Sequence, residues 1–313
     1  MSTDERTARP SWQNRVVTAL VAALGDREMF GDPARLHAAL DKRDRRTGEV
    51  RPPAALRKRA RVTREEFEGW PVFRITPPGP VRDAVFFLHG GGFIREIVGA
   101  HWKFAARLGL ESNAEVIVPI YPLVPHIGAA DMVAITTALL ARTVEERGTG
   151  RTFVVGNSAG AGLGLAAAQT LAAEDGPRPA GLILISPWLD GSMSHPDLPG
   201  LEAVDPFHRA AGLAEIGRLY ADGLSVRDPR VSPLFGPMTG LAPLTVFSGT
   251  RELFLTDART LADRAEAAGI PIDYHEAPGL PHNYALFPTP EGRAARAVIL
   301  AACRAPLPAG QPH

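Results

Sequence analysis

The chain has 313 residues, and its 34 Lys and Arg balance 34 Asp and Glu to a formal net charge of zero. No cationic excess exists to neutralise phosphates, which argues against a nucleic-acid partner or a polybasic membrane-binding role. Cys303 is the single cysteine, so an internal disulfide, a cysteine-rich zinc site and a CxxC redox pair are excluded.

Residues 1–68 are charged, rich in arginine and poor in strand signals, with helical patterns at about 11–25 and 33–46. The apolar run 16–25 has the length of a signal-peptide core, but acidic residues flank it and no A-x-A site follows. Its apolar positions fall at helical spacing, which predicts an amphipathic surface helix. Without an apolar run of 18 residues, we expect no membrane span and a cytoplasmic protein.

From Trp70 onward, short β-like runs alternate with helical patterns. The predicted strands are 72–76, 84–88, 115–120, 152–156, 182–186, 244–249 and 272–277. The predicted helices are about 101–112, 128–147, 159–174, 256–268 and 291–303. This alternation is typical of an α/β fold with a mostly parallel central sheet flanked by helices on both faces.

The interval 190–242 interrupts the alternation, because it is rich in proline and holds one helical pattern near 208–222. Insertions of this size between strands commonly lie over the sheet as a lid or binding element. We therefore expect N-terminal helices in 1–68 and an α/β domain in 69–305 with an insertion at about 190–235. A frayed tail in 306–313 follows.

Gly156-Asn157-Ser158-Ala159-Gly160 forms a G-x-S-x-G motif. The predicted strand 152–156 leads into it and a helix of small residues leaves it, which is the context of a nucleophile elbow. Glycines there permit close approach of neighbouring backbone. The alternative is a glycine-rich helix start with a capping serine.

His89-Gly90-Gly91-Gly92-Phe93 follows the predicted strand 84–88. Consecutive glycines allow N–H groups to turn toward an oxygen that develops negative charge. The alternatives are a flexible turn and a phosphate-binding loop, but the Lys-Ser/Thr of a P-loop is missing.

HGGGF, with GNSAG placing its serine 69 residues after the histidine, resembles the hormone-sensitive-lipase-like family of α/β-hydrolases, the bacterial family IV esterases. Further matching motifs are Tyr121-Pro122-Leu123, Ser186-Pro187-Trp188 and Ser232-Pro233-Leu234. The likeness spans nearly the whole chain. It implies that 1–68 and 190–235 together form a helical cap over an acyl pocket.

A serine nucleophile needs a base, and the base needs an orienting acid. On this fold the chain order is serine, acid, histidine. His282 lies in the loop after the strand pattern 272–277, at the same sheet edge as Ser158, and is the predicted base. His275 lies inside that strand pattern and is expected to be a solvated strand residue.

Glu252 follows the predicted strand 244–249, where the family carries Asp or Glu, and is the predicted acid. Asp257 is the alternative, although its place at a helix start suits a partner of the helix dipole. Asp205 belongs to the insertion and is expected to be too remote.

The resemblance implies that Ser158 attacks an acyl carbonyl while His282 takes its proton and Glu252 orients His282. The N–H groups of Gly90, Gly91 and Ala159 would receive the oxyanion. No metal and no organic cofactor is implied. Candidate substrate-binding residues, each of which could instead belong to the core, are Phe93, Arg95, Trp188, Phe207, Tyr220 and Phe287.

The favoured reaction is hydrolysis of carboxylic esters of small to medium acyl chains through an acyl-enzyme. Lactone opening, amide cleavage and acyl transfer would use the same residues, and a homodimer stays open. A rival is a non-catalytic receptor for a small molecule, but such receptors on this fold have lost the histidine that His282 represents. Asn157, where GDSAG is usual, and the charge pair Arg95-Glu96 weaken any transfer of substrate preference.

Overall fold

The fold is organised around one sheet in the computed structural model, which describes residues 9–25, 27–44 and 50–304. Its eight described strands have the order β1-β2-β4-β3-β5-β6-β7-β8, with the first two pairings antiparallel and the rest parallel. The strands are β1 (Arg61–Phe67), β2 (Trp70–Thr76), β3 (Asp83–Leu88), β4 (Ala114–Pro119), β5 (Thr152–Asn157), β6 (Gly181–Ile185), β7 (Leu244–Arg251) and β8 (Ile272–Pro281).

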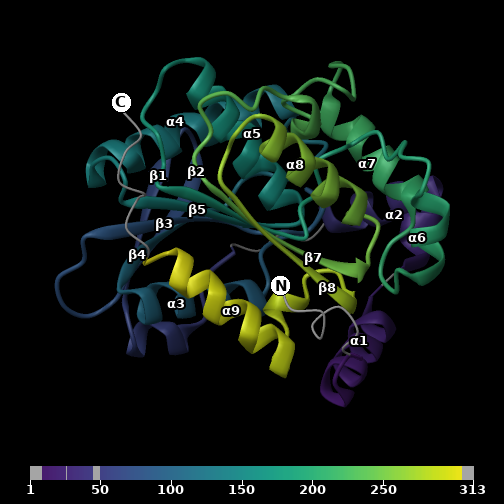
Figure 1. The fold of residues 1–313 in the computed structure, drawn as a ribbon, viewed down its shortest axis with the longest axis horizontal. Coiled ribbons are helices and arrows are strands. Elements are labelled where there is room, and N and C mark those ends of the chain that lie inside the picture. The colour runs from purple at the N-terminus through teal and green to yellow at the C-terminus, as the bar shows by residue number, and fades with distance from the viewer. Residues whose placement is uncertain (1–8, 26, 45–49, 305–313) are drawn as a thin grey trace.

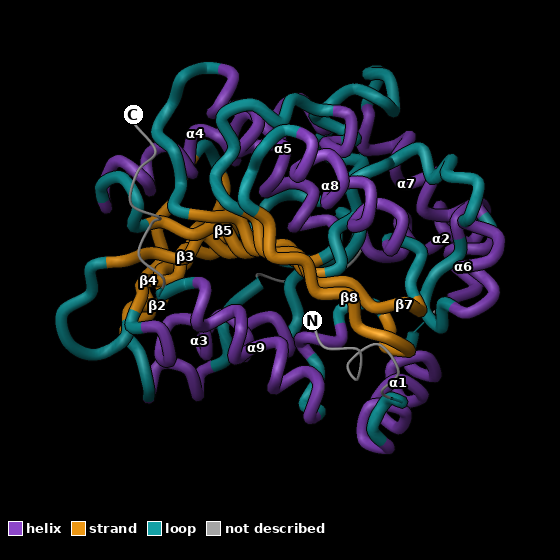
Figure 2. The backbone as a smooth tube through the Cα atoms, in the orientation of Figure 1, coloured by secondary structure: helices purple, strands orange, loops and turns teal. Residues whose placement is uncertain are grey.

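Helices cover both faces of the sheet, which confirms the predicted α/β fold. Figures 1 and 2 show α3 and α9 on one face and α4, α5 and α8 on the other, while α2, α6 and α7 gather beyond one end of the strands. The helices are α1 (Trp12–Leu24), α2 (Pro33–Asp44), α3 (Gly99–Ser112), α4 (Ala129–Arg147), α5 (Ala159–Ala173), α6 (Leu198–Val204), α7 (Ala210–Ala221), α8 (Leu255–Ala267) and α9 (Pro290–Ala302). The short 3-10 helix η1 (Arg27–Gly31) joins α1 to α2.

The central strands consist mainly of buried apolar residues, since helices cover both of their faces. In β3, the run 84–88 has no exposed surface, and its side chains belong alternately to the two cores on either side of the sheet. Parallel strands buried in this way appear in a sequence as continuous apolar runs. That property explains why the sequence predicts the central strands, and each of the seven predicted strands is present.

Two elements were not predicted. β1 pairs with β2 over seven residues although the sequence of 1–68 is poor in strand signals. An edge strand is held through its backbone, and its side chains stay largely exposed. The sheet therefore begins at Arg61. α6 has only seven residues and carries Pro199 in its first turn, so it lacks a periodic apolar pattern. The predicted tail 306–313 lies outside the described residues.

The N-terminal helices and the insertion bind each other beyond the carboxyl ends of the strands. Arg27 Nη2 donates to the carbonyl oxygen of Glu202 at 2.7 Å, and His37 Nε2 lies 2.8 Å from Glu215 Oε1. We call the described residues of 9–44 together with 190–235 the cap. None of the described helices combines the length and apolarity that crossing a bilayer requires.

Candidate active site

Ser158 lies on a tight turn between β5 and α5. Its backbone has φ 55° and ψ −124°, a conformation that L residues rarely adopt and that costs about 1–3 kcal/mol. A Cβ on Gly160 would lie 2.3 Å from the carbonyl oxygen of Leu88, so only glycine allows helix α5 to pass this close to β3. The turn thus holds the serine in the strained geometry of a nucleophile elbow.

Ser158, His282 and Glu252 are brought together by three loops that follow parallel strands. His282 Nε2 lies 3.0 Å from Ser158 Oγ, and His282 Nδ1 lies 2.6 Å from Glu252 Oε2. The other carboxylate oxygen of Glu252 accepts the Gly249 N–H at 2.9 Å and the Ser248 hydroxyl. Ser158, His282 and Glu252 are all buried.

His282 is held in the form that a base requires. Burial lowers the pKa of His282 below its ordinary value of 6.5, and the hydrogen bond and charge of Glu252 offset part of this effect. Because a carboxylate accepts the Nδ1 hydrogen, Nε2 is left as the acceptor that faces the Ser158 hydroxyl. The geometry therefore suits proton transfer from serine to imidazole.

The alternative acid, Asp257, is buried elsewhere. Its Oδ2 accepts the N–H groups of Leu189 at 2.7 Å and Asp190 at 3.0 Å. Asp257 thus binds the loop after β6, whereas the sequence predicts that it interacts with the start of its own helix. Burial raises the pKa of Asp257 to about 8. His275 lies within β8, half-buried, with Nε2 2.8 Å from Asp273 Oδ2.

Of the three predicted oxyanion donors, Gly90 is the one whose N–H already has an acceptor within the protein. Its N–H is already donated to Asn157 Oδ1 at 2.9 Å. Among the described residues, the N–H groups of Gly91, Gly92 and Ala159 have no hydrogen-bond acceptor. Gly91 and Gly92 line the same cavity as Ser158, and Ala159 follows Ser158 in the chain. Gly92 was available in the same HGGG motif, but the sequence cannot show which of three consecutive amides is used internally.

The first residue of the HGGG loop, His89, packs against Tyr121 of the Tyr121-Pro122-Leu123 motif. The Tyr121 ring stacks on the His89 ring at 4.3 Å between centroids, and its hydroxyl donates to the His89 carbonyl oxygen. Burial, followed by the charge of His101, lowers the pKa of His89 to about 3, so this histidine is neutral. Its role is to shape the loop.

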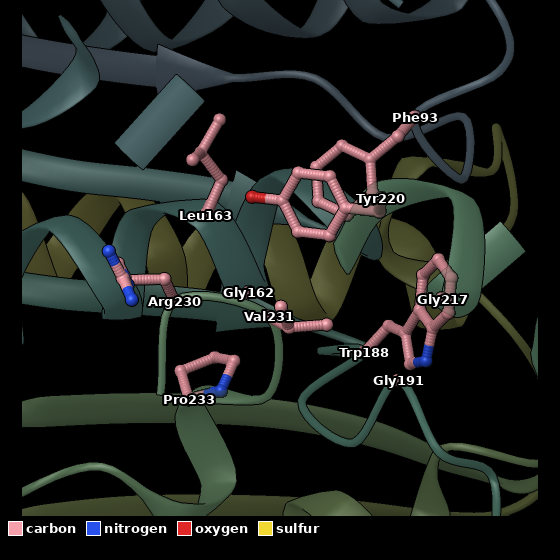
Figure 3. A pocket seen from close by; sticks show the side chains of 10 residues that line it. All are labelled: Phe93, Gly162, Leu163, Trp188, Gly191, Gly217, Tyr220, Arg230, Val231 and Pro233. Atoms are coloured by element: carbon pink, nitrogen blue, oxygen red, sulfur yellow. The ribbon is translucent and has the colours of Figure 1, made fainter. Parts of the chain in front are cut away.

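A cavity of about 380 Å³ opens above Ser158 and His282. Four of the six predicted pocket residues line it, namely Arg95, Trp188, Phe207 and Phe287. Phe93 and Tyr220 do not line it. Their rings stack at 4.1 Å and border a separate small cavity between α7 and α5, shown in Figure 3. The sequence predicts that both residues lie near the carboxyl ends of the strands, but it does not show which cavity their rings face.

Most of the remaining lining comes from residues that the sequence did not single out. Val21, Arg27 and Phe30 come from the N-terminal part of the cap, His208 and Leu213 from the insertion, and His101, Phe254 and Leu286 from loops and helices around the sheet edge. The amphipathic pattern at 16–25 predicted a surface helix without predicting its contact with the pocket. In the described residues, no three His, Cys, Asp or Glu side chains are grouped as metal ligands.

Known proteins resemble the chain in both sequence and fold. Residues 85–286 match the family described as the alpha/beta hydrolase fold. The chain is 35% identical over 227 residues to a triacylglycerol lipase of Mycobacterium tuberculosis, a match that spans 72% of this chain and 47% of that protein. It is 33% identical to an acetyl-hydrolase of Streptomyces hygroscopicus, over 67% of this chain and 72% of that protein.

A solved structure of an esterase from the bacterial hormone-sensitive lipase family superposes with a TM-score of 0.80. It is 27% identical and covers 96% of this chain and 100% of its own. The chain is therefore an α/β-hydrolase by fold and by family. Within that class it belongs to the hormone-sensitive-lipase-like family IV esterases, which are carboxylic ester hydrolases, and the resemblance carried by HGGGF and GNSAG is confirmed.

Proposed function

We propose that this chain hydrolyses carboxylic esters of small to medium acyl chains, with Ser158 as nucleophile, His282 as base and Glu252 as orienting acid. The observation that carries the proposal is the unbroken series of contacts from Ser158 Oγ to His282 at 3.0 Å and from His282 to Glu252 at 2.6 Å, at the floor of a cavity. The names of the relatives, which include a lipase, an acetyl-hydrolase and an esterase, support the same chemistry.

In the acylation step, Ser158 Oγ attacks the ester carbonyl carbon while His282 Nε2 takes the hydroxyl proton. The carbonyl oxygen becomes an oxyanion within reach of the N–H groups of Gly91, Gly92 and Ala159. His282 then gives its proton to the leaving alcohol, and the acyl group remains on Ser158. Glu252 stabilises the imidazolium that forms transiently.

Deacylation repeats the same proton transfers with water as the nucleophile. His282 takes a proton from water, hydroxide adds to the acyl carbon, and the proton is returned to Ser158 Oγ as the carboxylic acid leaves. Because burial lowers the pKa of His282, the imidazole is ready to accept a proton at neutral pH. Each step uses only this chain's own residues, the ester and water.

The proposed acyl length follows from the cavity. Its volume of about 380 Å³ is near the lower end of the range of about 300–1,000 Å³ that is usual for small-molecule pockets. Aromatic and aliphatic side chains provide most of the wall, including Trp188, Phe207 and Phe254. Such a wall favours an apolar acyl chain, and the volume disfavours a long one.

A series of p-nitrophenyl esters from acetate to palmitate tests the proposal. We expect kcat/KM to peak among short and medium chains and Ser158→Ala to lose turnover on every ester. Ser225→Ala, at an exposed serine of the insertion, is the matched control and should retain full activity. Activity of Ser158→Ala at the wild-type level would exclude the proposed nucleophile, and a maximum at palmitate would exclude the proposed acyl range.

A further inference from the structure

A second carboxylate–histidine pair lies against the first. Asp205 and His208 occupy the loop between α6 and α7, with His208 Nδ1 3.2 Å from Asp205 Oδ2. The His208 ring meets the His282 ring edge to face, with 4.7 Å between centroids and 89° between planes. Asp205, which is expected from the sequence to be too remote for the site, thus contacts His208, and His208 contacts the proposed base His282.

Asp205 uses its two carboxylate oxygens for different purposes. Oδ1 accepts the N–H groups of Phe207 at 2.7 Å and His208 at 3.1 Å, which closes its own turn. Oδ2 accepts the N–H of Leu253 at 3.0 Å in addition to its contact with the His208 ring. Leu253 directly follows Glu252, so the cap is bonded to the loop that carries the proposed acid.

Asp205 is 1% exposed, and a buried charge is tolerated only with partners that stabilise it. Burial alone would raise the pKa of Asp205, but the charge and hydrogen bond of His208, with the Phe207 N–H and the charge of His282, bring it below its ordinary value. Asp205 is therefore ionised at neutral pH and has a full complement of donors.

The His208 ring is enclosed on its other sides by aromatic rings. Its centroid lies 5.5 Å from that of Phe30 and 5.4 Å from that of Phe254, and Phe254 also packs against His282 at 5.0 Å. Arg27 Nε donates to the His208 carbonyl oxygen at 3.3 Å, which ties this loop to the N-terminal part of the cap. The ring therefore has little freedom to turn away from His282.

We propose that Asp205 and His208 are a positioning pair, through which the cap holds His282 and the loop of Glu252 in the geometry of the triad. Asp205 fixes the backbone after Glu252, and the His208 ring forms the wall that keeps the His282 imidazole between Glu252 and Ser158. Neither residue transfers a proton in this proposal. This inference rests on the proposed function, and it makes the seating of the cap a condition for rapid chemistry as well as for substrate binding.

The charged and titratable groups around His282 affect its pKa, and a purely structural role of the pair would leave that pKa unchanged. Glu252 and Asp205 raise the pKa of His282, and His208 lowers it. Tyr284 lies within the electrostatic reach of Glu252, and Arg27 approaches from the cap through the His208 carbonyl. Changing Asp205 or His208 should thus shift the acidic limb of the kcat/KM–pH profile in opposite directions.

Asp205→Asn and His208→Phe test the pair. Asn keeps the size of the side chain but has only one acceptor oxygen, so it cannot serve both the backbone N–H groups at Oδ1 and the donors at Oδ2. Phe keeps the aromatic contact with His282 but loses the bond to Asp205. We expect each variant to lower kcat by about 10–100-fold with a smaller change in KM, as for a misplaced catalytic group. The acidic limb should move to lower pH in Asp205→Asn and to higher pH in His208→Phe.

The cap also holds an exposed carboxylate–histidine pair that provides a matched control, His195 and Asp197, with His195 Nδ1 4.0 Å from Asp197 Oδ2. His195→Phe and Asp197→Asn should leave kcat and the acidic limb unchanged. The rate at which a phosphonate labels Ser158 gives a second measure of serine activation, which should fall in Asp205→Asn and His208→Phe and which does not depend on the choice of ester.

Wild-type kcat, pH profile and labelling rate in folded His208→Phe would overturn the proposal, even if Asp205→Asn fails to fold. A lower melting temperature in either variant with unchanged kinetics would also overturn it, because the pair would then be structural only. Ser158→Ala, measured in parallel, separates the two proposals: turnover in that variant removes the triad itself, whatever the cap variants show.

Discussion

Asn157 is the residue at which this chain departs from the GDSAG motif usual in its family, and its side chain braces the loop opposite. Asn157 Oδ1 accepts the Gly90 N–H at 2.9 Å, and Nδ2 is buried with no hydrogen-bond partner among the described residues. This contact occupies the first glycine amide of the HGGG motif, and we propose that the following two serve the substrate. An Asp in this position could accept the same bond but would add a negative charge next to the nucleophile.

Asn157→Asp is expected to raise the kinetic pKa of His282, because a nearby anion stabilises the imidazolium. Burial keeps the pKa of His282 below 6.5 in the wild type, and protonated His282 cannot accept the serine proton, so activity falls as the pH drops through that pKa. The acidic limb of the kcat/KM–pH profile should therefore move upward in the variant. Superimposed profiles would leave bracing of Gly90 as the sole role of Asn157.

Glu252→Gln is expected to lower kcat severely, since a neutral amide supports the wrong tautomer of His282; the comparable change in a serine protease costs about ten-thousand-fold. Asp257→Asn should remain close to the wild type, because the amide oxygen still accepts from Leu189 and Asp190 and a costly buried carboxyl group is lost. Steady-state kinetics of both variants decide the matter. Greater damage from Asp257→Asn would show that the acid has been assigned to the wrong residue.

At the scale of elements, the two parts of the cap are held together by close backbone packing. A Cβ on Gly212, in the first turn of α7, would lie 2.4 Å from the carbonyl oxygen of Phe30 in η1. Gly200, in α6, has no atom within 4 Å of the same position and provides a matched comparison. The contact at Gly212 lets α7 and η1 approach closely enough to enclose the pocket.

Gly212→Ala is expected to force α7 away from η1 and to lower stability by about 1–3 kcal/mol, the usual cost of overpacking. Gly200→Ala should be neutral or slightly stabilising, because alanine is the better helix former and meets no obstacle. Thermal unfolding and kcat/KM on a short ester measure both effects. Equal melting temperatures for the two variants would contradict the close packing of the cap.

The elements that the sequence predicted well are those whose burial is one-sided or complete. Strands β3 and β5 each contain an uninterrupted run of buried apolar residues, and helix α5 begins at the small residues after Ser158, so their patterns are unambiguous. β1 is not predicted because its side chains are largely exposed and polar, so its sequence lacks the apolar pattern of a buried strand. Ser158, His282 and Glu252 were foreseeable because each follows a strand that ends at the same edge.

Other features of the site depend on contacts between distant segments, which no local pattern records. The Gly90 N–H is consumed by a side chain 67 residues away. Asp205 reaches Leu253 across 48 residues, and His208 meets His282 through the docking of the cap. Phe93 and Tyr220 were placed in the pocket on residue type alone, and the packing of α7 turned them toward each other.

In the molecule as a whole, the residues of the candidate active site lie at the carboxyl edge of the parallel strands. The loops after β3, β5, β7 and β8 carry Gly91, Ser158, Glu252 and His282 respectively, and the cap lies over the same edge. Open α/β sheets place their sites at this edge because all parallel strands point to it. Residues far apart in the sequence, Phe30 and Phe287 among them, thereby become walls of one cavity.

Reaction with a serine-directed phosphonate, followed by peptide mapping, tests the central claim most directly. The elbow geometry, the 3.0 Å contact with His282 and the free amides beside it predict one adduct per chain, on Ser158, with turnover lost in proportion to labelling. The adduct should be absent in Ser158→Ala. An adduct on another residue, or a fully labelled protein that still hydrolyses esters, would contradict the assignment of Ser158 as the nucleophile.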